Sequence, residues 1–235
     1  KLVLCLAIIT MLLPGLFIFE PQYASASYYF ESGSGTESDP YIVSTPEHLD
    51  NVRLFPNAYF LQAEDIDLAD WPDWMPICSS SNPFAGEYNG GGHIISNLTI
   101  IGEDLVNFGL FGRIGEGGAV KNLRLTNFNI DVLFTAGTLV GENLGTIEHC
   151  HARGGSVTCH GPNAGGLAGR NIGLIKFCSA DVQVSGREIA GGLVGVMDIR
   201  EESRIENSYA LGKVDTIEYG DKRIKKILLL FNIQT

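Results

Sequence analysis

The sequence predicts an all-β fold: a right-handed parallel β-helix, a solenoid of roughly 28-residue coils, with a short N-terminal capping helix. The first observation is a glycine-rich phrase that recurs three times, with a shorter fourth copy, at residues 137–141, 165–169, 191–195 and 109–112. The second is its spacing. The closing glycines of the four copies lie 29, 28 and 26 residues apart, and a fixed period of this size is typical of stacked repeat architectures.

The third observation is that short apolar runs fill each period without a helical pattern. Two such runs separated by a glycine turn favour strands, and three short strands with three turns would complete one coil. Coils of a parallel solenoid lie about 4.8 Å apart, so equivalent residues of successive coils stack on one another. We therefore expect two interior columns, formed by Leu139, Leu167 and Leu193 and by Ile147, Ile175 and Ile205.

Two asparagines occupy one turn of successive repeats. Asn143 and Asn171 each lie two residues past a closing glycine, and a further glycine follows each at the same offset. Stacked amides can hydrogen-bond from coil to coil, which would give buried polar groups a partner. The sequence therefore predicts an asparagine ladder along this corner.

These phrases resemble the GLUG repeat of secreted bacterial surface proteins. The resemblance covers about residues 33–215, and the stretches 35–45 and 84–100 look like the segments that precede such repeats. It implies a β-helix at the cell surface, and it implies that Cys150 and Cys178, at the same repeat position, are ordinary core residues. Such repeats also accompany immunoglobulin-A-cleaving metallopeptidases.

Residues 1–26 form a predicted signal peptide. An apolar run over residues 2–19 follows Lys1, and Ala24, Ser25 and Ala26 supply the small residues of a signal-peptidase site. Cleavage after Ala26 is favoured over a retained membrane anchor, because Pro14 and Gly15 interrupt the run. The mature protein is then expected to be secreted or at the cell surface, with no membrane partner after cleavage.

Residues 27–57 are expected to form a lead-in and an N-terminal cap. Thr45 has the character of an N-cap and Pro46 suits the first helical position, so a short helix is predicted there to cover the first coil.

Residues 58–219 are assigned to the parallel β-helix. The segment 59–68 is expected to be the first strand of the stack, with Ile66 and Leu68 inward and Asp65 and Asp67 outward. In the last repeat, extra charged residues over 196–203 predict a surface bulge. Residues 220–235 do not follow the repeat pattern and are expected to form an irregular tail, a truncated or frame-disturbed end being favoured over a capping helix.

Charge and composition exclude some functions. The net charge of −11 and the sequence pI near 4.8 argue against nucleic acid as a partner, which would demand a basic footprint. An acidic, soluble extracellular surface is the simplest interpretation.

Two clusters raise the question of metal binding. Asp65, Asp67, Asp70 and Asp73 suggest calcium, but they lack the spacing of an EF-hand loop, so solvated carboxylates are favoured. The zinc-ligand types His149, Cys150, His151, Cys159, His160 and Cys178 contain no Cys-x-x-Cys pair, and buried thiols are favoured over zinc. A Cys150–Cys178 disulfide stays open as an alternative. No metal, cofactor-binding or catalytic residue is assigned.

No catalytic motif is present in the sequence: it contains no His-Glu-x-x-His, no Gly-x-Ser-x-Gly and no Gly-x-x-x-x-Gly-Lys. Glu148, Lys176 and Glu206 change sign from coil to coil, as expected of a solvated face. A non-catalytic adhesion or surface-binding module is therefore favoured, its partner an unknown extracellular glycan or protein surface. End-to-end self-association of the open stack is a further expectation. The alternative is a β-helix accessory domain of a larger secreted hydrolase, either a metallopeptidase or a polysaccharide-active enzyme.

Overall fold

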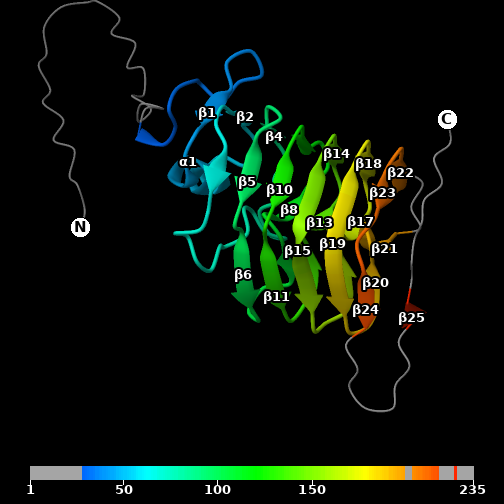
Figure 1. The fold of residues 1–235 in the computed structure, drawn as a ribbon. Helices are drawn as coiled ribbons and strands as arrows, with labels where there is room; N and C mark the ends of the chain where they lie inside the picture. Colours follow the sequence, from blue (N-terminus) through cyan, green and yellow to red (C-terminus); the bar gives the residue numbers. More distant parts are fainter. Residues whose placement is uncertain (1–27, 199–202, 217–224, 227–235) are drawn as a thin grey trace, which may run out of the picture.

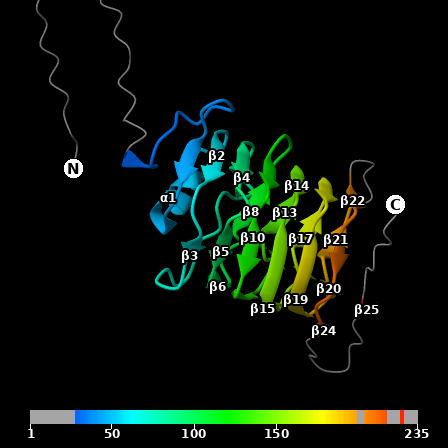
Figure 2. The same cartoon turned by 45° about the horizontal axis from the view of Figure 1, so that its top comes forward.

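The computed structural model describes residues 28–198, 203–216 and 225–226, whose strands wind into one elongated stack of coils (Figure 1). The predicted signal peptide, residues 1–26, lies outside the described residues. Figure 2 shows the short helix at one end of the stack and β22 and β24 at the other. The predicted β-solenoid is thus confirmed, because every pairing between its strands is parallel and neighbouring coils are related by about one repeat length.

The strands lie in four sheets. A seven-stranded sheet contains β1 Tyr41–Val43, β2 Tyr59–Gln62, β4 Glu87–Asn89, β9 Ala119–Lys121, β14 Thr146–Glu148, β18 Leu174–Lys176 and β22 Arg204–Glu206. A nine-stranded sheet contains β3 Ile66–Asp67, β5 Ile94–Ser96, β6 Thr99–Gly102, β10 Arg124–Thr126, β11 Asn129–Val132, β15 His151–Cys159, β19 Ser179–Gly186, β23 Tyr209–Ala210 and β24 Val214–Thr216.

The two smaller sheets are formed by the strands that come first in each repeat. A five-stranded sheet contains β7 Asn107–Phe108, β12 Thr135–Gly137, β16 Asn163–Gly165, β20 Ile189–Gly191 and β25 Lys225–Lys226. A four-stranded sheet contains β8 Phe111–Ile114, β13 Val140–Asn143, β17 Ala168–Asn171 and β21 Val194–Met197. A full coil therefore carries four strands rather than the three expected, because the glycine-rich phrase itself turns a corner and divides into two strands.

The two predicted interior columns are confirmed. Ile147 pairs with Ile175 and Ile175 with Ile205 in register. Backbone hydrogen bonds run from Leu139 N to Leu167 O at 3.0 Å and from Leu167 N to Leu193 O at 2.8 Å. All are buried except Ile205, which is only partly buried. Each buried side chain contributes roughly 1.5–3 kcal/mol, so the columns hold the stack together.

The glycines between the columns allow close backbone approach. A Cβ at Gly165 would lie 1.9 Å from Ala168 O, and one at Gly191 would lie 1.9 Å from Val194 O. No side chain fits at either position. This explains why the phrase keeps its glycines where the two small sheets meet.

The predicted asparagine ladder is also present. Asn143 and Asn171 are fully buried, and Asn143 Nδ2 donates to Asn171 Oδ1 at 2.7 Å. Asn171 Nδ2 in turn donates to Gly173 O at 2.8 Å, and Gly145 N donates to Asn143 Oδ1 at 3.2 Å. The amides therefore satisfy the turn backbone and join one coil to the next.

The N-terminal cap is helical as predicted. The helix α1 spans Pro46–Asn51 and continues into the 3₁₀ turn Val52–Leu54. The Thr45 side chain accepts a hydrogen bond from His48 N at 3.2 Å, as expected of an N-cap. Leu49 of the helix and Val52 of the 3₁₀ turn are fully buried and join the core cluster.

The stack begins earlier than the sequence suggested. The first strand is β1, which pairs in parallel with β2, and not the segment 59–68. That segment divides into β2 and β3, which belong to different sheets, because the chain turns a corner at residues 63–65. Ile66 and Leu68 are buried while Asp65 and Asp67 are exposed, so the predicted inward and outward faces are confirmed.

The end of the chain is described only in part. Four residues of the predicted bulge, 199–202, lie outside the described residues, yet β22 returns to register with β18 after them. Of the predicted tail 220–235, only β25 is described, and it pairs in parallel with β20. None of the described helices is long and apolar enough to cross a membrane.

Candidate functional site

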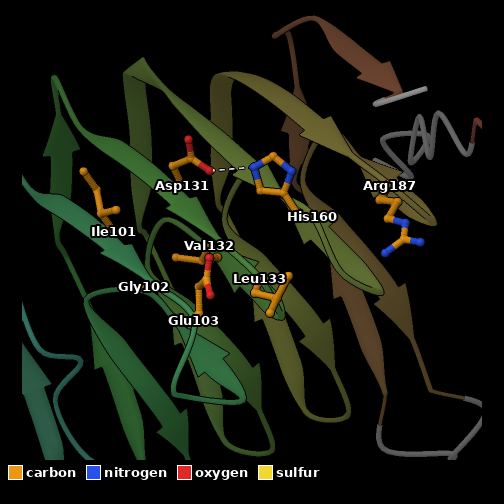
Figure 3. Close-up of a pocket in the computed structure, with 8 residues that line it drawn as sticks. All are labelled: Ile101, Gly102, Glu103, Asp131, Val132, Leu133, His160 and Arg187. Carbon is orange, nitrogen blue, oxygen red and sulfur yellow. Dashed lines mark hydrogen bonds and ion pairs between the residues drawn. The ribbon is translucent and has the colours of Figure 1, made fainter. Parts of the chain in front are cut away.

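A groove crosses the outer face of the nine-stranded sheet near the ends of β6, β11, β15 and β19 (Figure 3). It has a volume of about 560 Å³ and is open to solvent. We call it the Asp131 groove, and its lining is Ile101, Gly102, Glu103, Asp131, Val132, Leu133, His160 and Arg187. It is the best candidate binding site because carboxylates, an imidazole and a guanidinium all reach it.

A hydrogen-bonded pair of a carboxylate and an imidazole forms the centre of the Asp131 groove. His160 Nε2 lies 2.8 Å from Asp131 Oδ1, and both side chains remain accessible, with 38% and 50% of their surfaces exposed. Asp131 points outward from β11, and His160 follows the last residue of β15 in the next coil. The carboxylate thereby orients the imidazole, which is still partly exposed to solvent.

The other residues that line the Asp131 groove are both charged, as Glu103 and Arg187, and apolar, as Ile101 and Leu133. Glu103, Leu133, His160 and Arg187 each follow an outer strand in successive coils. Ile101 is 62% exposed beside Asp131. Open, mixed surfaces of this kind suit polar contacts to an extended ligand, and they do not enclose a small substrate.

A second groove, of about 600 Å³, lies between the cap and the first coils. Its rim carries the exposed apolar side chains of Leu54, Met75 and Val106. Arg53 is tied down there, since its guanidinium donates to Met75 O at 2.8 Å and to Pro76 O at 3.3 Å. Arg53 therefore holds the loop after Trp74 against the cap and has little freedom to bind a ligand.

Alternating charges form ladders on the outer faces. Glu142 lies 3.2 Å from Arg113 and 3.0 Å from Arg170, which also contacts Asp198 at 2.5 Å. The Glu142 side chain is only 11% exposed. This ladder was not predicted from the sequence, although its residues are 29 and 28 positions apart and so fall on neighbouring coils.

Glu148 and Lys176 also form an ion pair between coils, while Glu206 lies beside Lys176 in register and contacts Arg204 of its own strand. Lys176 Nζ lies 3.0 Å from Glu148 Oε1, and both side chains are largely covered. These residues were expected to be simply solvated. Parallel register places opposite charges directly side by side, so the sign change from coil to coil is part of the packing.

Two members of the acidic cluster near β3, Asp65 and Asp67, join neighbouring coils. Asp65 Oδ1 accepts from Ile94 N at 2.9 Å, which holds the pKa of that carboxyl below its usual range. The amide of Asn97, with Ala69 N, lowers the pKa of Asp67 in the same way. Over the described residues, no three His, Cys, Asp or Glu side chains are placed to hold a metal ion.

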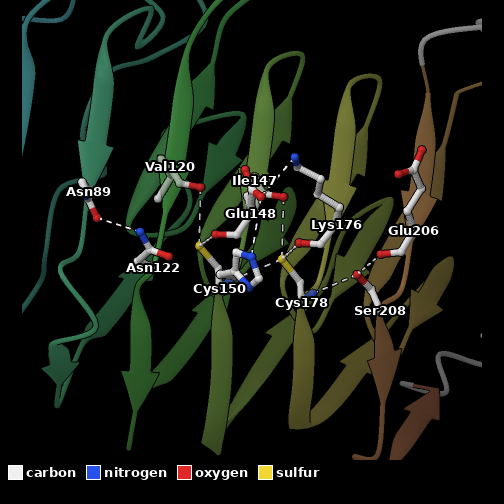
Figure 4. Close-up of polar contacts among 11 residues, drawn as sticks. Asn89, Val120, Asn122, Ile147, Glu148, Cys150, Lys176, Cys178, Glu206 and Ser208 are labelled. Carbon is white, nitrogen blue, oxygen red and sulfur yellow. Dashed lines mark hydrogen bonds and ion pairs between the residues drawn. The ribbon is translucent and has the colours of Figure 1, made fainter. Parts of the chain in front are cut away.

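The cysteines expected in the core are there. Cys150 and Cys178 are free, buried thiols, and burial raises the pKa of Cys150. Cys150 N donates to Cys178 Sγ at 3.4 Å, and Cys178 Sγ lies 3.1 Å from Lys176 O (Figure 4). Ser208 makes the same two contacts in the following coil, at 2.9 and 2.8 Å.

This column explains why cysteine recurs. The residue before each of these positions, His149, Phe177 and Asn207, has a positive φ of 48–54°. At this tight corner a thiol or a hydroxyl can bond to backbone groups of its own coil and of the coil before it. His149 and Phe177 stack their rings outside it, with centroids 4.9 Å apart.

The fold and these coil-to-coil contacts define a β-solenoid repeat module, and the comparisons agree. No family model matches the chain. The chain is 41% identical over 133 residues to a "Putative Gly-rich membrane protein" of Evansella cellulosilytica, covering 52% of this chain and 15% of that protein. It is 32% identical over 200 residues to "Halomucin" of Haloquadratum walsbyi, covering 77% of this chain and 2% of that protein.

The chain is thus a distant homologue of these proteins and spans only a small part of either. Among solved structures, it resembles a "putative immunoglobulin A1 protease from Bacteroides ovatus", with a TM-score of 0.50 and 20% identity. That match covers 83% of this chain and 73% of the other. A likeness at this identity supports the β-solenoid fold alone.

Proposed function

We propose that this chain is a non-catalytic, surface-binding module of an exported protein, and that the Asp131 groove contacts an extracellular glycan or protein surface. The observation that carries the proposal is the exposed Asp131–His160 pair in an open groove on a rigid stack. The much longer relatives, one of them named as a membrane protein, support the assignment to a module of a surface-associated protein.

The rigidity of the stack favours binding as the role of the groove. Asp131 lies on β11, and His160 directly follows the neighbouring parallel strand β15, with its backbone N–H bonded to Val132 O of β11. Side chains held by a regular sheet lose little freedom when a ligand arrives, which favours recognition. Both members of the pair can exchange their mutual contact for hydrogen bonds to sugar hydroxyls or to backbone amides.

The test is binding of the purified full chain to arrays of microbial and host glycans and of extracellular proteins. The variant Asp131→Asn/His160→Gln should lose at least about tenfold in affinity for any ligand found. Asp181→Asn is the matched control, because Asp181 pairs with Arg153 on the same sheet but outside the groove. Equal binding by the groove variant and the control would reject the groove as the site.

The non-catalytic part of the proposal has its own test. The purified chain should cleave neither polysaccharides nor proteins. Turnover that follows the folded protein through purification and disappears in the groove variant would overturn this, and would identify His160 as a base oriented by Asp131.

A second candidate function is that of an accessory β-helix domain of a larger secreted hydrolase. The structural likeness to the Bacteroides ovatus protein favours it. The sequence of the intact gene around this chain separates the two candidates. A neighbouring His-Glu-x-x-His domain would support the accessory role, whereas further repeats or a wall anchor would support the adhesive one.

Two finer assignments belong to the same proposal. We assign the repeats to the GLUG type on their glycine, asparagine and cysteine positions; a GLUG-repeat structure with these residues facing away from its core would contradict that. Export through residues 1–26 predicts a mature N-terminus at Ser27. N-terminal sequencing of the secreted protein from a bacterial host measures it, and an uncleaved chain retained in the membrane would favour the anchor.

A further inference from the structure

At the last strand of the seven-stranded sheet, β22, the isoleucine column ends in a side chain that is partly exposed to solvent. Ile147 and Ile175 have no exposed surface, whereas Ile205 in β22 is only partly buried. Ala210 of the same coil is likewise less buried than Ala152 and Ala180. Figure 1 shows β22 at the far end of the stack from α1, and β25 continues a different sheet. Among the described residues, no strand covers β22.

The backbone of β22 offers one residue to a new partner. Arg204 N donates to Gly173 O, and Glu206 O accepts from Phe177 N, so both residues direct their backbone groups toward β18. Successive residues of a strand direct these groups to opposite sides. The N–H and C=O of Ile205 therefore face the free edge, which is the arrangement that adds another strand.

The side chains of β22 are complementary to a reversed copy of themselves. Arg204, Ile205 and Glu206 place a cation and an anion symmetrically about an apolar residue, and both charged side chains are well exposed. In an antiparallel pair centred on Ile205, each Arg204 lies opposite the Glu206 of the other copy. The two Ile205 residues exchange both backbone hydrogen bonds, as the central residues of such a pair do.

We propose that two copies of this chain join end to end through β22, in an antiparallel pair centred on Ile205. The seven-stranded sheets then run on as one sheet, and Ile205 of each copy covers the column of the other. A pairing shifted by one residue would place the core face of one copy's sheet on the same side as the outer face of the other's, so the register is specified. Tyr209 and Leu211, 49% and 71% exposed in the same coil, add apolar surface near the contact.

Charge exchange tests this pairing in the full chain. Arg204→Glu and Glu206→Arg each create two like-charge contacts across the two-fold axis, because every substitution appears twice. Each should weaken association by about tenfold or more, and the double variant should restore it to within a few-fold. Sedimentation velocity from low micromolar to several hundred micromolar protein, at physiological ionic strength, measures the dissociation constants.

These variants distinguish the effect of edge pairing on association from the effect of net charge. Glu206→Arg makes the acidic chain less acidic, so simple charge repulsion predicts stronger association, whereas edge pairing predicts weaker association. Arg153→Glu changes the net charge as Arg204→Glu does, from a side chain that is 82% exposed on another sheet, and should have little effect. Circular dichroism confirms that each variant folds.

Every outcome decides the proposal. Weakening by both single variants with rescue by the double variant supports it. A monomer at all concentrations, stronger association of Glu206→Arg, or equal association of all variants overturns it.

Discussion

Removing the middle of the isoleucine column tests the stacked register most directly. Ile175 is fully buried between Ile147 and Ile205, whereas Ile205 ends the column and is partly exposed. Ile175→Ala and Ile205→Ala remove the same three carbons from the same column. They therefore differ only in how completely the site is enclosed.

The magnitude follows from burial. Each buried methylene contributes about 0.8 kcal/mol, so the transfer loss at Ile175 is about 2.4 kcal/mol. Neighbours above and below cannot collapse into the gap, so a cavity raises the total to about 3–4 kcal/mol. At Ile205 water already reaches the side chain, and we expect about 1–2 kcal/mol. Ile175→Asp should unfold the stack, because it buries an unpaired charge in a domain stabilised by about 5–15 kcal/mol.

Urea denaturation followed by circular dichroism measures both free energies of unfolding. Tryptophan fluorescence is a second probe, because Trp71 and Trp74 report on the first coils alone. Coincident transitions would indicate that the coils unfold together. A loss of less than about 1 kcal/mol for Ile175→Ala, or a loss no larger than that of Ile205→Ala, would refute the stacked register.

Four further predictions concern single side chains. Cys178→Ser should change stability by less than about 1 kcal/mol, since Ser208 makes the same contacts, whereas Cys178→Val should cost about 2 kcal/mol; similar melting shifts for both would contradict this. Asn171→Ala should cost about 2–3 kcal/mol by chemical denaturation, because it leaves the Asn143 amide and turn groups unpaired; a neutral result would mean that the ladder is only a packing feature. Thr138→Val should raise stability by about 1 kcal/mol in the same assay, since the buried Thr138 hydroxyl has no hydrogen-bond partner in the described part of the chain; a loss of stability would point to a bound water. Asp67→Asn should lower the melting temperature near neutral pH, with a difference that shrinks as pH falls below about 4, because hydrogen bonds to its carboxylate depress the folded pKa and that stability is lost on protonation; a pH-independent difference would exclude this cause.

The fold could be predicted from the sequence because the sequence is periodic. In a parallel solenoid each residue stacks on its own equivalent, so a repeat of constant length identifies the coil, its inward residues and its corners without any long-range information. The columns through Leu167 and Ile175 and the asparagine ladder follow from that rule, whereas the burial of Cys150 and Cys178 was implied by the resemblance to the GLUG repeat. The helix of the N-terminal cap could also be predicted, because Thr45 and Pro46 are by themselves a local signal for the start of a helix.

The sequence was less informative where the period is irregular. The glycine-rich phrase looks like a single strand followed by a turn, but it spans two sheets, because its glycines permit a corner that no larger residue allows. β1 was missed as the first strand because it is followed by a helix and not by a second strand of the same coil. The Asp131 groove escaped notice because its two central residues are not equivalent positions: Asp131 pairs with Thr158, and His160 lies two residues further along the chain.

The sequence by itself determined the period, the interior columns and the acidic character of this protein, because these depend only on which residue recurs and how often. The tertiary structure decided which outward side chains meet. Glu142 lies between two arginines, His160 reaches Asp131, and Ile205 turns its backbone to an open edge. Those contacts depend on where each corner bends and which way each strand faces, and both are set by packing across the whole coil.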